Sequence, residues 1–272
     1  MLDRKQKYLQ IALNSNLRDA RLIISQIPPD KRIIIEAGTP LIKEYGSEGI
    51  RKVKSWWEQK VFGYASDISE PLELEPFGLS QNNSLLMNLL LKSIEQKKKK
   101  EVKNNVTGAK KITFAPYIVA DLKCMDRGET EVILAKSAGA NAAVCLGQAP
   151  VETIEAFIDN CENNNLDSMI DMMNVEFPLN ILRQLKKPPE AVILHRGVDE
   201  EIFNPESEIP FHEIQRIKSE YDIMVAVAGG DTFQEVQRAI FNDADIVVVW
   251  KSFYQSTAET AKLAEEFLKE IR

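Results

Sequence analysis

The chain lacks the features that mark several common classes of protein. Its 34 Lys and Arg are outnumbered by 41 Asp and Glu, giving a formal net charge of -7, whereas a nucleic-acid-binding surface is basic. No apolar run approaches the roughly 20 residues that span a bilayer, and residues 1–7 lack the apolar core of a secretory leader. The 3 cysteines have no zinc-like spacing, which is typical of a reduced compartment. We therefore expect a cytoplasmic protein that binds a small molecule, without nucleic-acid or membrane partners.

The chain contains instead a repeating order of short apolar runs and helical segments. The runs are almost solid Val, Ile, Leu and Ala, which is typical of parallel strands buried on both faces. We expect strands at Leu9–Leu13, Ile33–Ala37, Tyr117–Leu122, Ala142–Leu146, Ser168–Met172, Ala191–Leu194, Ile223–Ala228 and Ile246–Val249. We expect helices at Leu17–Gln26, Ser47–Glu58, Glu129–Ala138, Val151–Glu162, Pro178–Leu185, Phe211–Tyr221, Phe233–Phe241 and Thr257–Ile271. Eight such units in 272 residues predict a single α/β domain, a (β/α)8 barrel over residues 1–272.

One segment interrupts this alternation of strands and helices. Residues 59–115, between the second helix and the third strand, exceed what a βα unit needs, and a loop of that length is usually functional or disordered. The segment contains an apolar helix candidate, Ser84–Glu95, and the lysine run Lys97–Lys100. We interpret it as an insertion whose apolar helix packs on the barrel, over its mouth, or on a partner subunit. The lysine run is interpreted as a solvated helix end, with a phosphate or nucleic-acid contact as the alternative.

The most informative residues follow the apolar run Tyr117–Ala120. Asp121 and Lys123 are two positions apart, so on a strand they point to the same face, and Asp126 follows in the loop. Glu36 lies at the end of the neighbouring strand, and barrels carry their chemistry at the C-terminal ends of strands. Two carboxylates from adjacent strands are hard oxygen ligands of the kind that hold Mg²⁺. The alternative is that Glu36 forms a buried ion pair with Lys123.

The remaining strand ends also carry polar residues or glycines. His195 directly follows Ala191–Leu194 and has Arg196 beside it, which makes it an acid–base candidate. His212 lies within a helix and is expected at the surface. The other strand ends carry Asn14, Asp171, Gly229-Gly230 and Trp250-Lys251. All of these side chains are expected to meet at one rim of the barrel.

Several blocks of the sequence together carry a family resemblance. They are Leu9-Gln-Ile-Ala-Leu-Asn14, Ile35-Glu-Ala-Gly-Thr-Pro-Leu-Ile42, Val119-Ala-Asp-Leu-Lys-Cys-Met-Asp126, Leu194-His-Arg-Gly-Val-Asp199 and Val225-Ala-Val-Ala-Gly-Gly230. In this order they resemble the 3-hexulose-6-phosphate synthase and 3-keto-L-gulonate-6-phosphate decarboxylase group of the orotidine 5'-phosphate decarboxylase suprafamily. The likeness covers nearly the whole chain except the insertion, and the second and third blocks are its specific part.

The resemblance implies carbon–carbon bond formation or cleavage through an enediolate, assisted by Mg²⁺. Glu36 and Asp121 match the family's Mg²⁺ ligands, where the ion acts as a Lewis acid. Lys123 matches the lysine that neutralises the oxyanion, and His195 the residue that handles protons. Asp126 matches an aspartate contributed across a homodimer interface to the neighbouring active site. Substrate contacts are then expected from Asn14, Asp171, Arg196, Gly229, Gly230 and Lys251. In the synthase direction the enediolate of ribulose 5-phosphate attacks formaldehyde, and the reverse is an aldol cleavage.

The sequence departs from this family at two strand ends. Relatives end the first strand with Asp, whereas this chain has Asn14, which removes a negative charge and a potential base. Relatives bind the substrate phosphate through glycine-rich ends of the seventh and eighth strands, where backbone N–H groups approach the anion. This chain follows Gly229-Gly230 with Asp231, and it has Trp250-Lys251 at the second position.

Three interpretations stay open. In the first, the chain is a divergent Mg²⁺-dependent lyase whose substrate differs at its anionic end and is either unphosphorylated, or aromatic and stacked on Trp250, Trp56 or Trp57. In the second, it is a true 3-hexulose-6-phosphate synthase that binds phosphate through Lys251 and Arg196. In the third, it is a catalytically inactive barrel that serves as a regulatory or assembly subunit. The joint presence of polar residues at five strand-end positions argues against the third interpretation: Glu36, Asp121, Lys123, Asp126 and His195.

Overall fold

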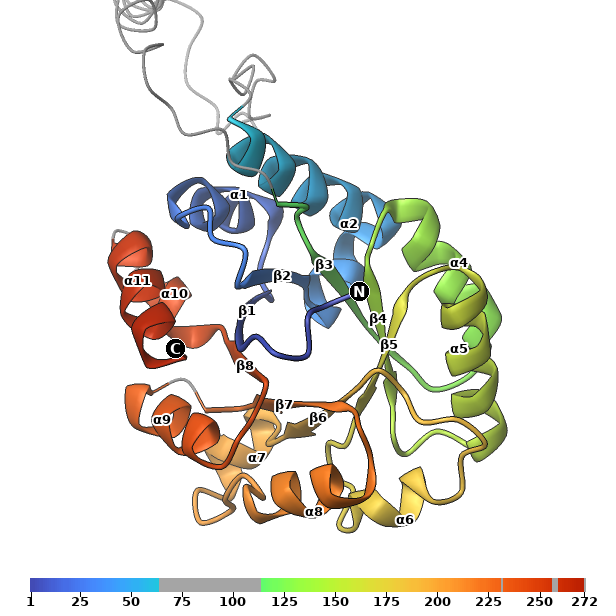
Figure 1. Ribbon diagram of the computed structural model, residues 1–272. Helices are drawn as coiled ribbons and strands as arrows, with labels where there is room; N and C mark the ends of the chain where they lie inside the picture. The colour runs from blue at the N-terminus through green and yellow to red at the C-terminus, as the bar shows by residue number, and fades with distance from the viewer. Residues whose placement is uncertain (64–113, 231, 256–258, 272) are drawn as a thin grey trace, which may run out of the picture. The chain divides into compact units, whose positions relative to one another are not determined.

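The computed structural model describes residues 1–63, 114–230, 232–255 and 259–271. Met1–Val61 and Phe114–Arg272 form one compact unit, and Phe62–Thr113 form a second. In the first unit the parallel strands β1 to β8 follow one another around a closed barrel, and β1 pairs with β8 to complete it. Figure 1, which looks down this barrel, shows the helices as a ring around the strands. The predicted (β/α)8 barrel is confirmed.

The elements alternate along the chain as expected for this fold. The strands are β1 (Tyr8–Leu13), β2 (Ile33–Ala37), β3 (Ile118–Cys124), β4 (Ala142–Leu146), β5 (Asp167–Asp171), β6 (Ala191–His195), β7 (Met224–Ala228) and β8 (Ile246–Val249). The helices are α1 (Leu17–Gln26), α2 (Thr39–Phe62), α4 (Gly128–Ala138), α5 (Val151–Asn163), α6 (Pro178–Leu182), α7 (Val198–Phe203), α8 (His212–Glu220), α9 (Phe233–Phe241), α10 (Lys251–Gln255) and α11 (Thr260–Glu270). None of the described helices is long and apolar enough to cross a membrane.

The long segment between α2 and β3 stands where the sequence predicts an insertion. Helix α2 runs on to Phe62, so residues 59–62 belong to the helix. The predicted helix Ser84–Glu95 and the lysine run Lys97–Lys100 lie outside the described residues.

The helix predictions are wrong at a few places, each for a local reason. Helix α2 begins at Thr39 instead of Ser47, because two helical parts are joined across a kink at Gly46, whose φ of 58° favours glycine. The short helices α7 and α10 are not predicted, because five or six residues are too few to show a helical period. Helix α6 ends at Leu182, earlier than expected.

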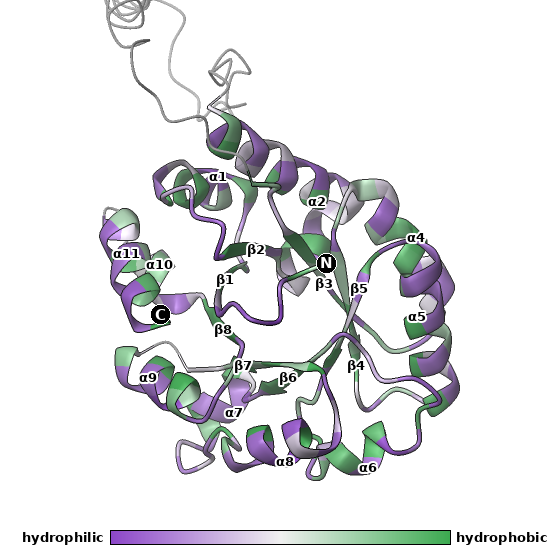
Figure 2. Ribbon diagram, viewed as in Figure 1, coloured by the Kyte–Doolittle hydropathy of each residue, from purple (hydrophilic) through white to green (hydrophobic). Residues whose placement is uncertain are grey.

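The interior of the barrel is filled by side chains from the strands. Every residue of β1, β2, β5, β7 and β8 is buried. Figure 2 shows these strands as predominantly hydrophobic, whereas the surrounding helices carry both hydrophobic and hydrophilic residues. A cluster of small and bulky side chains packs inside the barrel, including Ala12, Ile34, Val119, Val144, Met169, Ile193, Ala226 and Val248. This packed core leaves room for chemistry only at the barrel ends.

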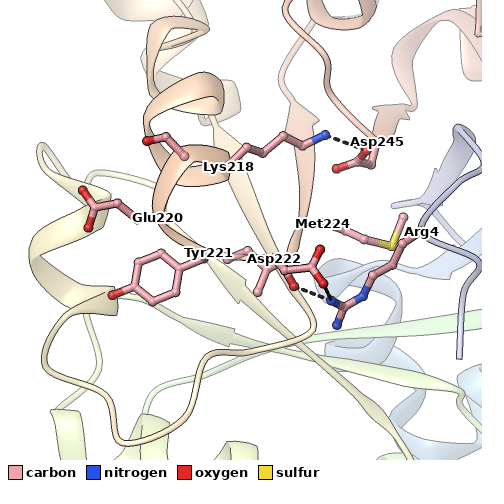
Figure 3. Close-up of a pocket in the computed structure, with 9 residues that line it drawn as sticks. Arg4, Lys218, Glu220, Tyr221, Asp222, Met224 and Asp245 are labelled. Carbon is pink, nitrogen blue, oxygen red and sulfur yellow. Dashed lines mark hydrogen bonds and ion pairs between the residues drawn. The ribbon is translucent and has the colours of Figure 1, made fainter.

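The N-terminal end of the barrel is closed by a network of ion pairs around a cavity of about 350 Å³ (Figure 3). Asp245 accepts from Lys218 at 2.8 Å and from Lys7 at 3.2 Å, and its second oxygen accepts from the backbone N–H of Val225 at 2.8 Å. Arg4 forms an ion pair with Asp222 on the other side of this cavity. The charged groups of this end are thus engaged with one another, which indicates a structural role.

Asp245→Asn should therefore destabilise the barrel. The variant loses both ion pairs of a buried carboxylate, and we expect the free energy of unfolding to fall by about 2 kcal/mol, measured by urea denaturation. Asp243→Asn is the matched control, because Asp243 binds the same lysines from an exposed position and should cost less than about 1 kcal/mol. Equal losses in the two variants would contradict a special role for the buried carboxylate.

Candidate active site

The C-terminal ends of the strands surround a cavity of about 490 Å³. Most of the predicted site residues line it, namely Asn14, Glu36, Asp121, Lys123, Asp171, His195, Arg196 and Gly229. Trp250 lines the same cavity, so the space between Gly229 and Trp250 is not filled by the indole. The fold therefore brings together residues that are up to about two hundred positions apart in the sequence.

Two buried carboxylates lie in one part of this cavity. Gln10 Nε2 donates to Glu36 Oε2 at 2.5 Å, and Thr39 Oγ1 donates to Asp121 Oδ2 at 2.7 Å. Burial, together with the negative charge of Asp121, raises the pKa of Glu36 to about 7. Two residues that line the cavity each have a buried oxygen without a hydrogen-bond partner among the described residues, Asp121 Oδ1 and Gln10 Oε1.

This donor set fits a magnesium ion. Carboxylate and amide oxygens are hard ligands, and Mg²⁺ is usually held by one or two carboxylates while waters and substrate oxygens complete its shell. Within the described residues no group of three or more His, Cys, Asp or Glu forms a complete metal site, so an ion here would rely on such outside ligands. A cation would also counteract the burial and the repulsion by Asp121 that raise the pKa of Glu36.

Lys123 reaches the cavity through an irregular stretch of β3. The pairing of β3 with β4 shifts register between Ala120 and Cys124, and Lys123 has a φ of 46°, which is uncommon outside glycine. Such a bulge redirects a side chain. Lys123 Nζ lies 2.7 Å from Asp171 Oδ2 and 3.4 Å from Asp121 Oδ2. The expected shared face of Asp121 and Lys123 is thus present, and Lys123 pairs with these carboxylates instead of Glu36.

Asp171 is the centre of a buried hydrogen-bond network. Its Oδ2 accepts from Lys123 and lies 2.8 Å from His195 Nδ1, while its Oδ1 accepts from the backbone N–H of Met173 at 2.9 Å. Burial raises the pKa of Asp171, but the charges of His195 and Lys123 outweigh burial and lower it to about 2. Asp171 was expected to bind substrate. Asp171 lines the cavity, and its side chain, only 1% exposed, is engaged by Lys123 and His195.

The same contacts set the charge of Lys123 and His195. Burial lowers the pKa of Lys123, yet Asp121 and Asp171 outweigh it and hold that pKa above its ordinary value. Burial likewise lowers the pKa of His195, and Asp171 outweighs it and raises the value. Because Nδ1 faces a carboxylate, it is assigned the ring proton, which leaves Nε2 for proton transfer.

Three expected site residues do not line the cavity: Asp126, Gly230 and Lys251. Asp126 is exposed in the loop after β3. Lys251 forms an ion pair with Glu201 of α7. Asp231, which departs from the family pattern after Gly229-Gly230, lies outside the described residues.

The aromatic residues divide between the cavity and the outer helices. Trp250 lies beside the cavity, with Tyr254 edge-on at 6.1 Å between ring centroids. Trp57 is fully buried in α2, and Trp56 packs against the Arg21 guanidinium at 5.8 Å. Neither Trp56 nor Trp57 lines the cavity, so the expectation that they stack on a substrate is wrong for this site.

Sequence reasoning missed four polar or charged residues that line the cavity: Gln10, Thr39, Lys43 and Glu201. Gln10 is the polar residue within the otherwise apolar strand Tyr8–Leu13, which is a signal that can be recognised in a sequence. Thr39 belongs to the Gly-Thr-Pro block that carries the family resemblance. Glu201 gives no such signal, because it lies among other acidic residues in the unpredicted helix α7.

A closed barrel with acidic, lysine and histidine side chains at its C-terminal rim is the architecture of an enzyme. Residues 96–266 match the model of the "Orotidine 5'-phosphate decarboxylase / HUMPS family", and the chain belongs to this family. Its members are carbon–carbon lyases and decarboxylases, the enzyme class expected from the sequence. The resemblance given by the sequence blocks is therefore confirmed.

Curated relatives are similar along most of this chain. The chain is 32% identical over 249 residues to the "Bifunctional enzyme Fae/Hps" of Methanocella arvoryzae, a match that covers 90% of this chain and 48% of that protein. It is 30% identical over 267 residues to the protein of the same description from Methanothrix thermoacetophila, covering 97% and 53%. The chain thus spans about half the length of the curated relatives it matches.

Solved structures share the fold. A crystal structure of 3-hexulose-6-phosphate synthase superposes with a TM-score of 0.67 at 22% identity, covering 97% of this chain and 100% of that one. The structure of KGPDC from Streptococcus mutans superposes with a TM-score of 0.63 at 17% identity, covering 98% and 97%. At these identities the likeness bears on the barrel fold alone.

Replacing Asp171 tests whether it governs His195. In Asp171→Asn the neutral amide no longer stabilises the imidazolium, so the pKa of His195 should fall. The chain has only 2 histidines, and an NMR titration can follow both. His212 is the internal reference, because it lies on α8 and contacts Glu213 instead of Asp171. An unchanged His195 titration would show that Asp171 does not set the charge of the ring.

Proposed function

We propose that this protein is a Mg²⁺-dependent aldol lyase of the 3-hexulose-6-phosphate synthase type, which joins formaldehyde to a ketose or releases it. The observation that carries this proposal is the convergence of Glu36, Asp121, Lys123 and His195 from β2, β3 and β6 in one cavity. The Fae/Hps relatives and the 3-hexulose-6-phosphate synthase structure support it. The chain spans about half of those bifunctional relatives, and the 3-hexulose-6-phosphate synthase structure matches it over 97% of its length, so the Hps activity is the one that we propose for it.

Glu36 and Asp121 would hold the ion, with Gln10 beside Glu36. Two buried carboxylates that repel each other, and two buried oxygens without partners in the described chain, are the observations that support a cation here. When bound, Mg²⁺ supplies Lewis-acid stabilisation of the negative charge that develops on substrate oxygens. Thr39 orients the Asp121 carboxylate by donating to its Oδ2.

His195 and Lys123 would then carry out the proton and charge steps. His195 removes a proton from the hydroxymethyl carbon of the ketose, and the electron pair delocalises onto the neighbouring carbonyl oxygen as an enediolate. The Lys123 ammonium stabilises that oxyanion. The enediolate carbon attacks the carbonyl carbon of formaldehyde, forming the new C–C bond. The C=O π pair moves to the formaldehyde oxygen, which accepts the proton that His195 removed from the ketose, and the reverse sequence is aldol cleavage.

The proposal includes a homodimer in which Asp126 serves the neighbouring active site. Asp126 is exposed and does not line the cavity of its own chain, and Met125 beside it is 47% exposed. An aspartate in that place can act on a substrate only if a second copy lies against the loop after β3. Sedimentation of the wild-type protein measures this assembly, and a monomer at all concentrations would contradict it.

Two variants separate the metal from the ammonium group. Asp121→Asn and Lys123→Met should each lower the Mg²⁺-dependent consumption of formaldehyde with ribulose 5-phosphate or ribulose by roughly 10²–10³-fold. Mg²⁺ should raise the thermal midpoint of the wild type and of Lys123→Met, but not of Asp121→Asn. Glu129→Gln, at an exposed position of α4, is the matched control and should behave as the wild type. Mg²⁺ stabilisation that survives Asp121→Asn unchanged would contradict the metal site.

The raised pKa of Glu36 makes a further prediction about metal binding. Mg²⁺ requires the ionised carboxylate, whereas metal-free Glu36, with a pKa of about 7, is protonated at lower pH. Binding therefore releases a proton and weakens as the pH falls. The dissociation constant measured by calorimetry should be about tenfold weaker at pH 6 than at pH 8. Glu129→Gln should show the same dependence as the wild type. An affinity independent of pH would mean that Glu36 is not a ligand.

A further inference from the structure

Two of the 3 cysteines lie opposite each other on neighbouring strands of the barrel. Cys124 ends β3 and is the register partner of Cys145 in β4. The Cys145 thiol donates to the backbone carbonyl oxygen of Cys124, with 3.1 Å between Sγ and O. Neighbouring strands lie about 4.8 Å apart, and a disulfide bond usually joins Cα atoms that are about 4.4–6.8 Å apart. The pairing of β3 with β4 therefore gives the two cysteines a separation that suits a disulfide bond.

The pair lies outside the cavity and beneath an exposed loop. Both cysteines are free and buried, and neither lines the cavity. The Cys124 thiol donates to the backbone carbonyl oxygen of Asp126 at 3.2 Å, and residues 125–127 are exposed. A small oxidant has only this short loop to displace before it reaches Cys124. The third cysteine, Cys161, is buried on α5.

The two thiols differ in acidity. The Cys145 thiol, as a hydrogen-bond donor, lowers the pKa of Cys124. The same contact, together with burial, raises the pKa of Cys145. Because the thiolate is the form that attacks an oxidant, this difference suits Cys124 to react first and Cys145 to resolve the product.

The pair is coupled to the site through the irregular end of β3. Lys123 directly precedes Cys124, and its φ of 46° belongs to the stretch in which β3 and β4 change register. This conformation brings Lys123 to Asp121 and Asp171. A disulfide bond requires its own torsion angles, and it removes the thiol hydrogen bonds to the backbone of Cys124 and Asp126. Its formation therefore changes the backbone that holds Lys123.

We propose that Cys124 and Cys145 form a reversible disulfide bond on oxidation by a hydroperoxide, and that this bond moves Lys123 away from the carboxylates of the site. The Cys124 thiolate attacks one peroxide oxygen, the O–O bond breaks, and a sulfenic acid and hydroxide form. The Cys145 sulfur then attacks the sulfenic sulfur, and the hydroxyl group leaves with the thiol proton as water. The two thiols together lose two electrons, and the peroxide is reduced to water. This redox control goes beyond the proposed lyase function, and the bond itself does not depend on that function.

Peptide masses after treatment with hydrogen peroxide test the bond. Trypsin digestion of the oxidised wild type should give Cys124–Arg127 linked to Ser137–Arg183. The linked pair should be lighter by two hydrogen atoms than the same peptides after reduction with dithiothreitol. Cys161 lies on the second peptide, so Cys161→Ala is the matched control and should give the same linked product. Cys145→Ala should give none.

The position of Lys123 is measured through His195 and through turnover. The Lys123 ammonium acts to lower the pKa of His195, so that pKa should rise in the oxidised protein, while the titration of His212 stays unchanged. Formaldehyde consumption should fall by roughly tenfold or more on oxidation. Dithiothreitol should restore it, because this reductant acts on a disulfide bond and not on methionine sulfoxide. Cys145→Ala should keep the rate that it has before treatment.

Two results would overturn the redox control. One is an oxidised wild type in which Cys124 and Cys145 are not linked. The other is a linked protein with an unchanged His195 titration, because Lys123 has then not moved. If the reduced protein consumes no formaldehyde, the lyase function fails, while the peptide masses and the His195 titration still decide whether the cysteine pair acts on the site.

Discussion

The chemistry of this site depends on an imbalance of buried charge at one rim of the barrel. Glu36, Asp121 and Asp171 are all buried there, and the Lys123 ammonium lies between two of them, Asp121 and Asp171. Lys123 and His195 hold Asp171 ionised, but Glu36 remains beside Asp121 with a pKa raised to about 7. Burying carboxylates without enough positive charge is costly. A divalent cation would relieve that cost, and this is the physical argument for the proposed Mg²⁺ site.

The barrel fold holds these charged side chains in a defined geometry. Parallel strands deliver their last residues to the same rim, so each carboxylate arrives on a rigid element surrounded by apolar neighbours. One departure from regular structure occurs at the centre of the site, where β3 changes register and Lys123 adopts a φ of 46°. Backbone conformations of this kind are costly and cluster at functional sites. Here the irregularity lets Lys123 reach both carboxylates.

The fold and half of the site were predictable because they depend on patterns of whole segments. Solid apolar runs predict buried parallel strands, and polar residues directly after them predict the rim that carries Glu36, Asp121, Lys123 and His195. Pairwise contacts were not predictable. Nothing in the sequence shows that Lys123 pairs with Asp171 instead of Glu36, because β3 and β5 are not neighbours and only the bulge brings the ammonium group across. The presence of Glu201 in the cavity depends on a loop helix too short to have a period.

The two parts of the cavity differ in their balance of charge. The carboxylate-rich part is short of positive charge and suits an ion with the oxygens of an enediolate. On the side of Glu201 and Trp250 the charges are paired, since Lys251 binds Glu201 and Arg196 binds Glu235. Loops after barrel strands change without disturbing the strand ends. A lyase of this family can therefore keep the residues of its strand ends while the loops beside them differ.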